Sequence, residues 1–330
     1  MRRCPRAAAV AAAAFIIILC GLALSGRVSA QDYPTRTVTL VVPYPPGGGV
    51  DAMARVVAEK LTGALGQQVV VDNRAGGSGL VGTRAFIKSQ PDGYTLFLGH
   101  TGSISINPSF YANAGFDPRK DFTPIGLIAS MPVALLAHPS FPAKTIGDVV
   151  AIARKDGAGF NIGTSAVGTG GYLSAELFKA TTGIDAAIIP YKGTGQVMND
   201  LLGNHVPVAF GVLPPALGNL QAGTLRAIAV LGPTRFSLLP DVPTAGESGL
   251  PGFESVLHYG LLAPAGTPRP VVDRLNAALR ALVETPEVKQ RIQAEGGDPL
   301  TSTPEEYATD IDREETKWGA LVRRLNLKVE

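Results

Sequence analysis

The chain has 330 residues, of which 45% are hydrophobic and 17% are charged, and its formal net charge at pH 7 is +2. The first thirty residues hold four arginines and no acids, so removing those four charges leaves −2, and nothing in the charge of the remaining chain suggests nucleic acid as a partner. Both cysteines, Cys4 and Cys20, lie in that same segment. Disulfides, thiolate catalysis and zinc–thiolate sites are therefore excluded from the remainder of the chain.

Residues 1–30 predict a secretory signal peptide. Arginines precede an apolar stretch over residues 7–24, and Val28-Ser29-Ala30 fits a small-residue cleavage motif. A membrane anchor is the alternative, but the stretch is nearer the length of a signal core than the roughly 20 residues of a spanning helix. We therefore expect cleavage after Ala30 and export of about 300 residues, enough for two domains or one large α/β domain.

Short apolar runs alternate with helical patterns over residues 38–125, which predicts βαβ units and a mainly parallel sheet. The expected strands are VTLVVPY, QQVVVDN and YTLFLGH, and the expected helices begin near Asp51 and span Leu80–Ser89. A glycine-rich loop follows each strand. In open sheets of this kind, ligands bind beyond the carboxyl ends of the strands, where these loops lie.

A second series of the same kind follows from residue 146 onward. The expected helices are Ile146–Lys155, Tyr172–Thr181 and Gln196–Leu202, and the expected strands are GFNIGT, AAIIP, HVPVAFGV and LRAIAVLG. Pro207 inside HVPVAFGV predicts an edge strand or the start of a strand, because proline cannot donate to a ladder.

The C-terminal region begins with a turn-rich stretch over residues 233–252, followed by the expected strand VLHYGLLAP and a helix from Pro270. Thr303-Pro304-Glu305-Glu306 is a capping box that predicts a last helix toward Leu325. We expect this helix to pack back on the first domain and make that domain discontinuous.

The loop after the first strand matches a dinucleotide fingerprint, G-x-G-x-x-A, over residues 47–52, with Asp72 at the expected spacing. An exported dinucleotide-dependent oxidoreductase is therefore the alternative function. Pro45 and Pro46 lengthen a turn that this fingerprint keeps tight, and an exported protein meets little NAD. Asp51 lies where a helix N-cap is expected, which favours capping over a catalytic role.

A second glycine-rich loop, residues 163–171, places three hydroxyls and several amides before a helix. An anion there would be held by neutral donors and the helix macrodipole. An ordinary connection is the alternative. The recurrence of such a loop in each half of the chain favours binding.

Catalytic and metal-binding patterns are not found. The chain contains no G-x-S-x-G elbow and no G-x-x-x-x-G-K-[ST] loop. His100, His138, His205 and His258 are scattered singly, so each is expected to be an isolated surface or loop residue, and no metal site is predicted. His100 alone ends a strand near the proposed site, and Arg74 and Lys192 are expected to be solvated surface charges.

These loops and their flanking motifs resemble the Bug (Bordetella uptake gene) family of periplasmic solute receptors, the binding components of tripartite tricarboxylate transporters. The resemblance covers essentially the whole mature chain. The matching segments are YPTRTVTLVVPYPPGGGVDAMAR, VVVDNRAGGSGLVGT, PDGYTLFLG, INPSFY, TGIDAAIIPYKGTG, AGTLRAIAV, LLPDVPTAGESGLPGFE and GLLAPAGTP.

The resemblance implies an α/β, two-domain periplasmic binding protein of the type II, Venus-flytrap class, with crossover strands near Leu127–Ala137 and Val256–Pro264. Residues 31–130 and 256–330 would form domain 1 and residues 131–255 domain 2. It also implies a monomeric receptor, not an enzyme, without a cofactor. Its partners would be a small carboxylate, either a di- or tricarboxylate or an aromatic acid, and a membrane permease or a sensor protein.

Carried over from the family, the ligand-binding residues come from both loops and from the cleft edge: Tyr44, Gly47, Gly48, Gly49, Asp51, Asn73, Thr101, Ser103, Ser165, Thr169, Gly170 and Gly171. The chain departs from the family where Pro207 replaces an aspartate and Gly211 replaces an acid or asparagine. The loss of polar groups near the second-domain cleft implies a less polar carboxylate than an amino acid, such as an aromatic acid.

Overall fold

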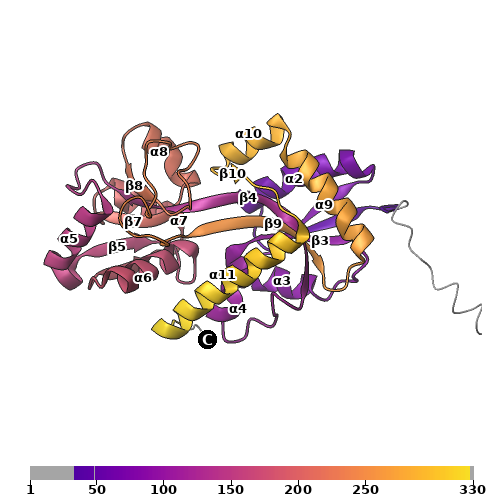
Figure 1. Cartoon of the computed structure of the whole chain (residues 1–330), viewed down its shortest axis with the longest axis horizontal. Helices are drawn as coiled ribbons and strands as arrows, with labels where there is room; N and C mark the ends of the chain where they lie inside the picture. The colour runs from indigo at the N-terminus through magenta and orange to yellow at the C-terminus, as the bar shows by residue number, and fades with distance from the viewer. Residues whose placement is uncertain (1–32, 48, 328–330) are drawn as a thin grey trace, which may run out of the picture.

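A computed structural model describes residues 33–47 and 49–327 of the chain (Figure 1). The expected signal peptide with its cleavage site, and Gly48, lie outside the described residues. Within the described part, no helix combines the length and the apolar character needed to cross a membrane.

The described strands form one ten-stranded mixed sheet that runs through the whole molecule. Its main order is β2-β1-β3-β9-β4-β7-β5-β6, with β10 and β8 also paired to β4. The central strands β4 (Phe122–Ala137) and β9 (Val256–Pro264) run antiparallel to each other from one half of the molecule to the other (Figure 1). They are the two crossover strands implied by the resemblance, with β4 beginning five residues earlier than expected.

The part built on three parallel strands is here called the first half. It contains β1 (Val38–Val42), β2 (Val69–Asn73), β3 (Thr95–His100), α2 (Gly49–Leu65), α3 (Leu80–Phe86) and α4 (Asn107–Phe110). The helical periodicity of α2 is confirmed, because Met53, Val57 and Leu61 are buried in the core of this half. The predicted second helix is shorter than expected and ends at Phe86.

The second half contains α5 (Ile146–Asp156), β5 (Asn161–Thr164), α6 (Gly170–Thr182), β6 (Ala187–Pro190), α7 (Thr194–Leu202), β7 (Val208–Val212), α8 (Leu217–Gln221) and β8 (Arg226–Val230). β7 begins directly after Pro207 and lies between β4 and β5. Of the two expectations for Pro207, the strand start is therefore confirmed and the edge position is wrong. A proline directly before the first residue of a strand leaves the ladder of a central strand intact.

The C-terminal elements are α9 (Arg269–Val283), α10 (Pro286–Ala294), β10 (Asp298–Pro299) and α11 (Pro304–Leu325). The predicted capping box is present: Glu306 N donates to Thr303 Oγ1 at 3.1 Å, and Thr303 N donates to the Glu306 carboxylate at 2.8 Å. As expected, α11 packs on the first half, against β4 and α4.

α11 also reaches the second half, which was not expected. Its buried residues Trp318 and Leu321 share an apolar cluster with Phe110 of α4 and Leu173 of α6. Figure 1 shows α11 passing beneath β9 toward α6. The last helix therefore links the two halves of the molecule.

Candidate ligand-binding site

Three aromatic side chains lie in a row across the carboxyl end of the first-half sheet. β1 and β3 are parallel with Val41 opposite Phe97, so Tyr44 and His100, each three residues further on, come side by side. Their rings stack at a centroid distance of 5.2 Å with 9° between planes. His100 pairs in register with Tyr259 of β9, and these rings lie 5.3 Å apart. We call Tyr44, His100 and Tyr259 the aromatic row.

His100 is neutral at physiological pH. Burial lowers its pKa from 6.5 to about 4. Its Nδ1 accepts a hydrogen bond from Gly102 N at 2.9 Å, so Nε2 carries the proton of the neutral ring. The expectation of an isolated surface or loop histidine is wrong for His100, because its ring is packed between two tyrosines. The uncharged ring carries one N–H donor, at Nε2.

Asp51 organises the first glycine-rich loop. Asp51 is 3% exposed, and its carboxylate accepts from Gly47 N and Arg55 Nε, both at 2.9 Å, and from Asn73 Nδ2 at 3.0 Å. Burial by itself favours the neutral acid, but these donors together hold the pKa of Asp51 below its usual value. Asn73 also donates to the Tyr44 carbonyl at 3.1 Å.

The predicted N-cap role of Asp51 is wrong. Asp51 is the third residue of α2, and its carboxylate reaches back to the amide of Gly47 instead of capping from outside the helix. An ionised carboxylate is negatively charged and has no proton to donate. It would therefore repel a carboxylate ligand. Asp51 and Asn73 therefore shape the loop that carries Tyr44 and Gly47.

Thr101 and Ser103 are buried, and their hydroxyls bond to the backbone. Thr101 Oγ1 accepts from His258 N of β9 at 2.9 Å. Ser103 Oγ donates to the His100 carbonyl at 3.1 Å and accepts from His100 N at 3.2 Å. These two predicted site residues fix the position of His100 and of β3 against β9.

The second glycine-rich loop opens α6 with a hydroxyl pair. The Thr169 hydroxyl donates to the Ala166 carbonyl at 2.7 Å and accepts from Tyr172 N at 3.4 Å, which caps the helix. Ser165 Oγ lies 2.8 Å from Thr169 Oγ1. The first two helical amides, those of Gly170 and Gly171, have no hydrogen-bond partner within the described residues. The first amides of a helix have no partner inside the helix and take partners from outside it.

Two glycines bring the N-terminus of α6 against the sheet. A Cβ atom on Gly171 would lie 2.7 Å from the Phe210 carbonyl, and one on Gly170 would lie 3.1 Å from the side chain of Leu257. Leu257 is two residues from Tyr259 in β9, so both side chains point to the same face. The N-terminus of α6 and the aromatic row therefore lie on one face of β9, beside Leu257 and Tyr259, whose Cα atoms are about 7 Å apart along the strand.

The remaining predicted site residues are placed as follows. Gly47 has φ of +86°, Gly49 opens α2 with free space around its Cβ position, and Gly48 lies outside the described residues. The hydrogen bonds of the first Gly-rich loop join residues of the first half only, and those of the second Gly-rich loop join residues of the second half only.

The reading of Gly211 as part of the cleft is wrong. A Cβ on Gly211 would point toward Met198 and Leu136, in the apolar core of the second half. Its lack of a polar side chain therefore does not bear on the ligand. The expectation of an isolated surface or loop histidine is also wrong for His258. Its side chain is largely buried and pairs with Asp310 of α11.

Residues 53–327 match the family model described as "Tripartite tricarboxylate transporter family receptor". The chain belongs to this family, the Bug receptors. Receptors of this family are periplasmic. This Bug receptor is 33% identical to protein BugT of Bordetella pertussis over 315 residues, which cover 95% of this chain and 97% of BugT.

Two solved structures show the same architecture with ligands. Rpa4515 of R. palustris with adipate is 35% identical with a TM-score of 0.77, and the match covers 88% of this chain and 98% of Rpa4515. MatC from Rhodopseudomonas palustris with bound malate is 32% identical with a TM-score of 0.74, covering 88% and 100% of the two chains. The Bug receptor described here therefore has the two-domain periplasmic binding protein fold, and the oxidoreductase alternative finds no support in these relatives.

Proposed function

We propose that this Bug receptor captures a small dicarboxylate between the aromatic row and the N-terminus of α6. The observation that carries the proposal is the position of both features on one face of β9, with unpartnered amides at Gly170 and Gly171. Helix N-termini bind anions through such amides and through the macrodipole. The relatives solved with adipate and malate support a dicarboxylate.

The carboxylates are held by uncharged donors. His100 is neutral and Arg55 is engaged by Asp51, so the donors of the proposed site are the amides of Gly170 and Gly171 and the His100 Nε2–H. An aromatic acid is a second candidate, because Tyr44, His100 and Tyr259 present stacked and tilted rings to the same space. Capture by such a site breaks no bond and needs no cofactor, so the protein acts as a receptor and not as an enzyme.

The proposed domains are residues 31–130 with 256–330, and residues 131–255. The distribution of the apolar core supports this division. The fully buried residues of two clusters come from 33–131 and 257–311, with Met131 at the boundary, and those of two others come from 133–253, while the cluster around Trp318 joins the two parts. A ligand that contacts both domains shifts the receptor toward its closed form. The closed monomer would then be recognised by a transporter permease or a sensor.

Thermal unfolding with a ligand panel tests the function. The exported protein, stripped of bound ligand by unfolding and refolding, is heated with malate, adipate, citrate, benzoate, aspartate or NAD. Malate, adipate or benzoate at about 100 times its dissociation constant stabilises the protein by about 2.7 kcal/mol. Stabilisation by NAD alone, or by none of the six compounds, contradicts the proposal.

Gly49→Val tests the site without a folding defect. Gly49 has open space around its Cβ position, so valine is accommodated but narrows the approach to the first loop. We expect at least about tenfold weaker binding of the stabilising acid in calorimetry, which is about 1.4 kcal/mol. Gly63→Val, in the same helix and equally unobstructed, is the control. Equal affinities of the two variants would exclude the loop from the site.

A further inference from the structure

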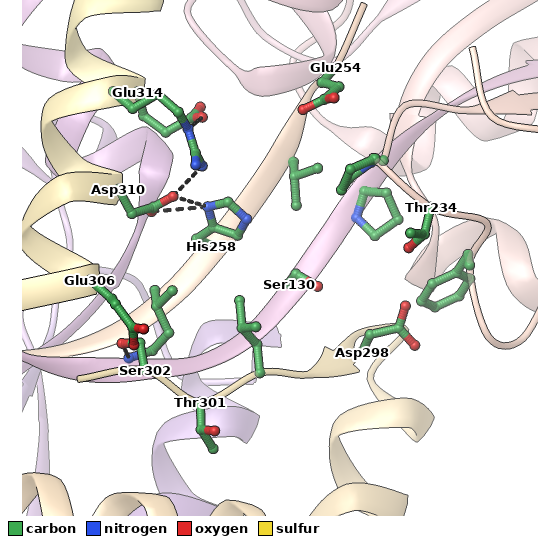
Figure 2. Close-up of a pocket in the computed structure, with 18 of the residues that line it drawn as sticks. Ser130, Thr234, Glu254, His258, Asp298, Thr301, Ser302, Glu306, Asp310 and Glu314 are labelled. Carbon is green, nitrogen blue, oxygen red and sulfur yellow. Dashed lines mark hydrogen bonds and ion pairs between the residues drawn. The ribbon is translucent and has the colours of Figure 1, made fainter. Parts of the chain in front are cut away.

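A second polar cluster lies on the opposite face of β9 from the aromatic row. Side chains alternate along a strand, so His258 points away from Leu257 and Tyr259 and toward α11. There it meets Asp310 and Glu314, which are four residues apart on the buried face of that helix. Figure 2 shows the three side chains turned toward one another at one end of a cavity of about 590 Å³.

The cluster has the dimensions of a metal centre. His258 Nδ1 lies 2.9 and 3.0 Å from the two oxygens of Asp310, and one donor atom from each of the three residues lies within 4.8 Å of the others. Donors around a tetrahedral zinc ion are about 3.3 Å apart, so a small side-chain rotation brings the set to bonding geometry.

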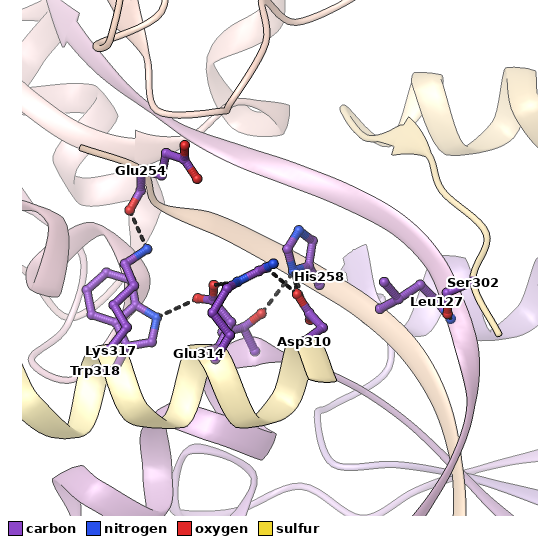
Figure 3. A network of polar contacts seen from close by, with 10 residues as sticks. Leu127, Glu254, His258, Ser302, Asp310, Glu314, Lys317 and Trp318 are labelled. Carbon is purple, nitrogen blue, oxygen red and sulfur yellow. Dashed lines mark hydrogen bonds and ion pairs between the residues drawn. The ribbon is translucent and has the colours of Figure 1, made fainter. Parts of the chain in front are cut away.

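A buried partner holds the Glu314 carboxylate in place. Trp318, 1% exposed, donates its Nε1–H to Glu314 Oε2 at 2.9 Å (Figure 3). A hydrogen bond of this kind orients a ligating carboxylate and is typical of the surroundings of bound metals. Lys317 is directed elsewhere, since its Nζ donates to the Glu254 carbonyl at 2.6 Å.

One exposed cation balances the buried carboxylates. Arg313 pairs with Asp310 and lies 3.3 Å from Glu314, while its own side chain is 60% exposed. Asp310 and Glu314 are only 9% and 6% exposed. Arg313 can therefore move into solvent without leaving a cavity, whereas the two carboxylates require a positive charge beside them.

The cavity as a whole is acidic. Its lining includes five carboxylates and the two side-chain cations Arg313 and Lys317: the acids are Glu254, Asp298, Glu306, Asp310 and Glu314. This charge balance attracts a cation into the cavity.

We propose that His258, Asp310 and Glu314 bind a divalent transition-metal ion such as Zn²⁺, which replaces Arg313 and fastens α11 to the crossover strand β9. One imidazole and two carboxylates are borderline-hard ligands that suit Zn²⁺, Co²⁺ or Mn²⁺ better than Ca²⁺, which takes oxygen ligands. The cavity gives water access to the remaining coordination position.

The single tryptophan of the chain makes this site measurable. Trp318 bonds directly to Glu314, so Co²⁺ bound there quenches its fluorescence, and no other tryptophan contributes to the emission. The purified protein without a histidine tag is freed of metal with a chelator and titrated with Co²⁺. We expect saturable quenching with one ion per chain, reversed by Zn²⁺.

Substitutions separate this site from non-specific binding. His258→Gln and Glu314→Gln keep side-chain size and polarity, and each should weaken Co²⁺ binding more than about tenfold. His205→Gln is the matched control, because His205 also faces an aspartate, Asp200, but is 72% exposed. Arg313→Gln should bind Co²⁺ more tightly than the wild type. Absence of saturable quenching, or the same affinity in the His258 and His205 variants, overturns the proposal.

Discussion

Both carboxylate oxygens of Asp51 accept hydrogen bonds from within the protein, and this decides what the residue does. The Gly-rich motif marked Asp51 as part of a binding loop, but a motif does not show where its side chains point. The contacts with Gly47, Arg55 and Asn73 assign Asp51 to shaping the loop. His100 is the reverse case, because it belongs to no motif, and the strand register places it between Tyr44 and Tyr259.

His100 makes stability depend on pH between its unfolded and folded pKa values. The folded pKa of about 4 lies below the ordinary 6.5, so the unfolded chain binds more protons in this interval. The contribution of His100 to the free energy of unfolding is fully present above about pH 6.5. It decreases as the pH falls toward 4, by at most about 3 kcal/mol.

His100→Gln should remove this dependence. The free energy of unfolding, measured in urea at pH 7 and pH 5, should fall more for the wild type than for the variant. His138→Gln, at an exposed turn of the second half, serves as the control and should follow the wild type. Parallel behaviour of the wild type and His100→Gln would show that His100 is not buried in its neutral form.

At the scale of elements, the contact between β9 and α11 places a glycine where a ring passes over the strand. Gly260 faces α11, and the Tyr307 ring occupies the space that a Cβ on Gly260 would need. His258 lies two residues earlier on the same face and meets Asp310. The strand pattern VLHYGLLAP predicted a strand correctly, but it could not show that this face receives the C-terminal helix.

Gly260→Ala should therefore destabilise the protein. Tyr307 is 1% exposed and cannot move into solvent, so the added methyl group forces the helix and strand apart. Overpacking of this kind costs about 1–3 kcal/mol of unfolding free energy, measurable by urea denaturation. Gly218→Ala, at an exposed helical position with no neighbour near its Cβ, should be neutral or slightly stabilising. Equal stabilities would mean that α11 is not held tightly on β9.

At the scale of the whole molecule, the two halves touch on both sides of the crossover strands. On one side, Trp318 and Leu321 of α11 pack with Leu173 of α6. On the other, the Ser237 hydroxyl of the second half donates to Asp298 of β10. The described arrangement is therefore stabilised by direct contacts between the halves as well as by β4 and β9.

Ser237→Ala should weaken ligand binding while leaving the stability of each half almost unchanged. The substitution removes one hydrogen bond between the halves, worth about 1 kcal/mol, and thereby favours their separation. The dissociation constant of the stabilising carboxylate, measured by calorimetry, should rise by up to about fivefold. Ser140→Ala, which affects a contact within the second half alone, should bind like the wild type. If Ser140→Ala weakened ligand binding more than Ser237→Ala, the contact between Ser237 and Asp298 would have no part in ligand capture.

The sequence by itself determined the family, the crossover strands, the capping box of the last helix and the two Gly-rich loops, because these depend on local patterns of apolar residues, glycines and caps. Only the tertiary structure decided the role of Asp51, the packing of His100, the orientation of Gly211 and the meeting of His258 with Asp310 and Glu314. These depend on strand register and on which helix covers which face. The His258 cluster joins residues more than fifty positions apart, and no spacing rule in a single sequence connects them.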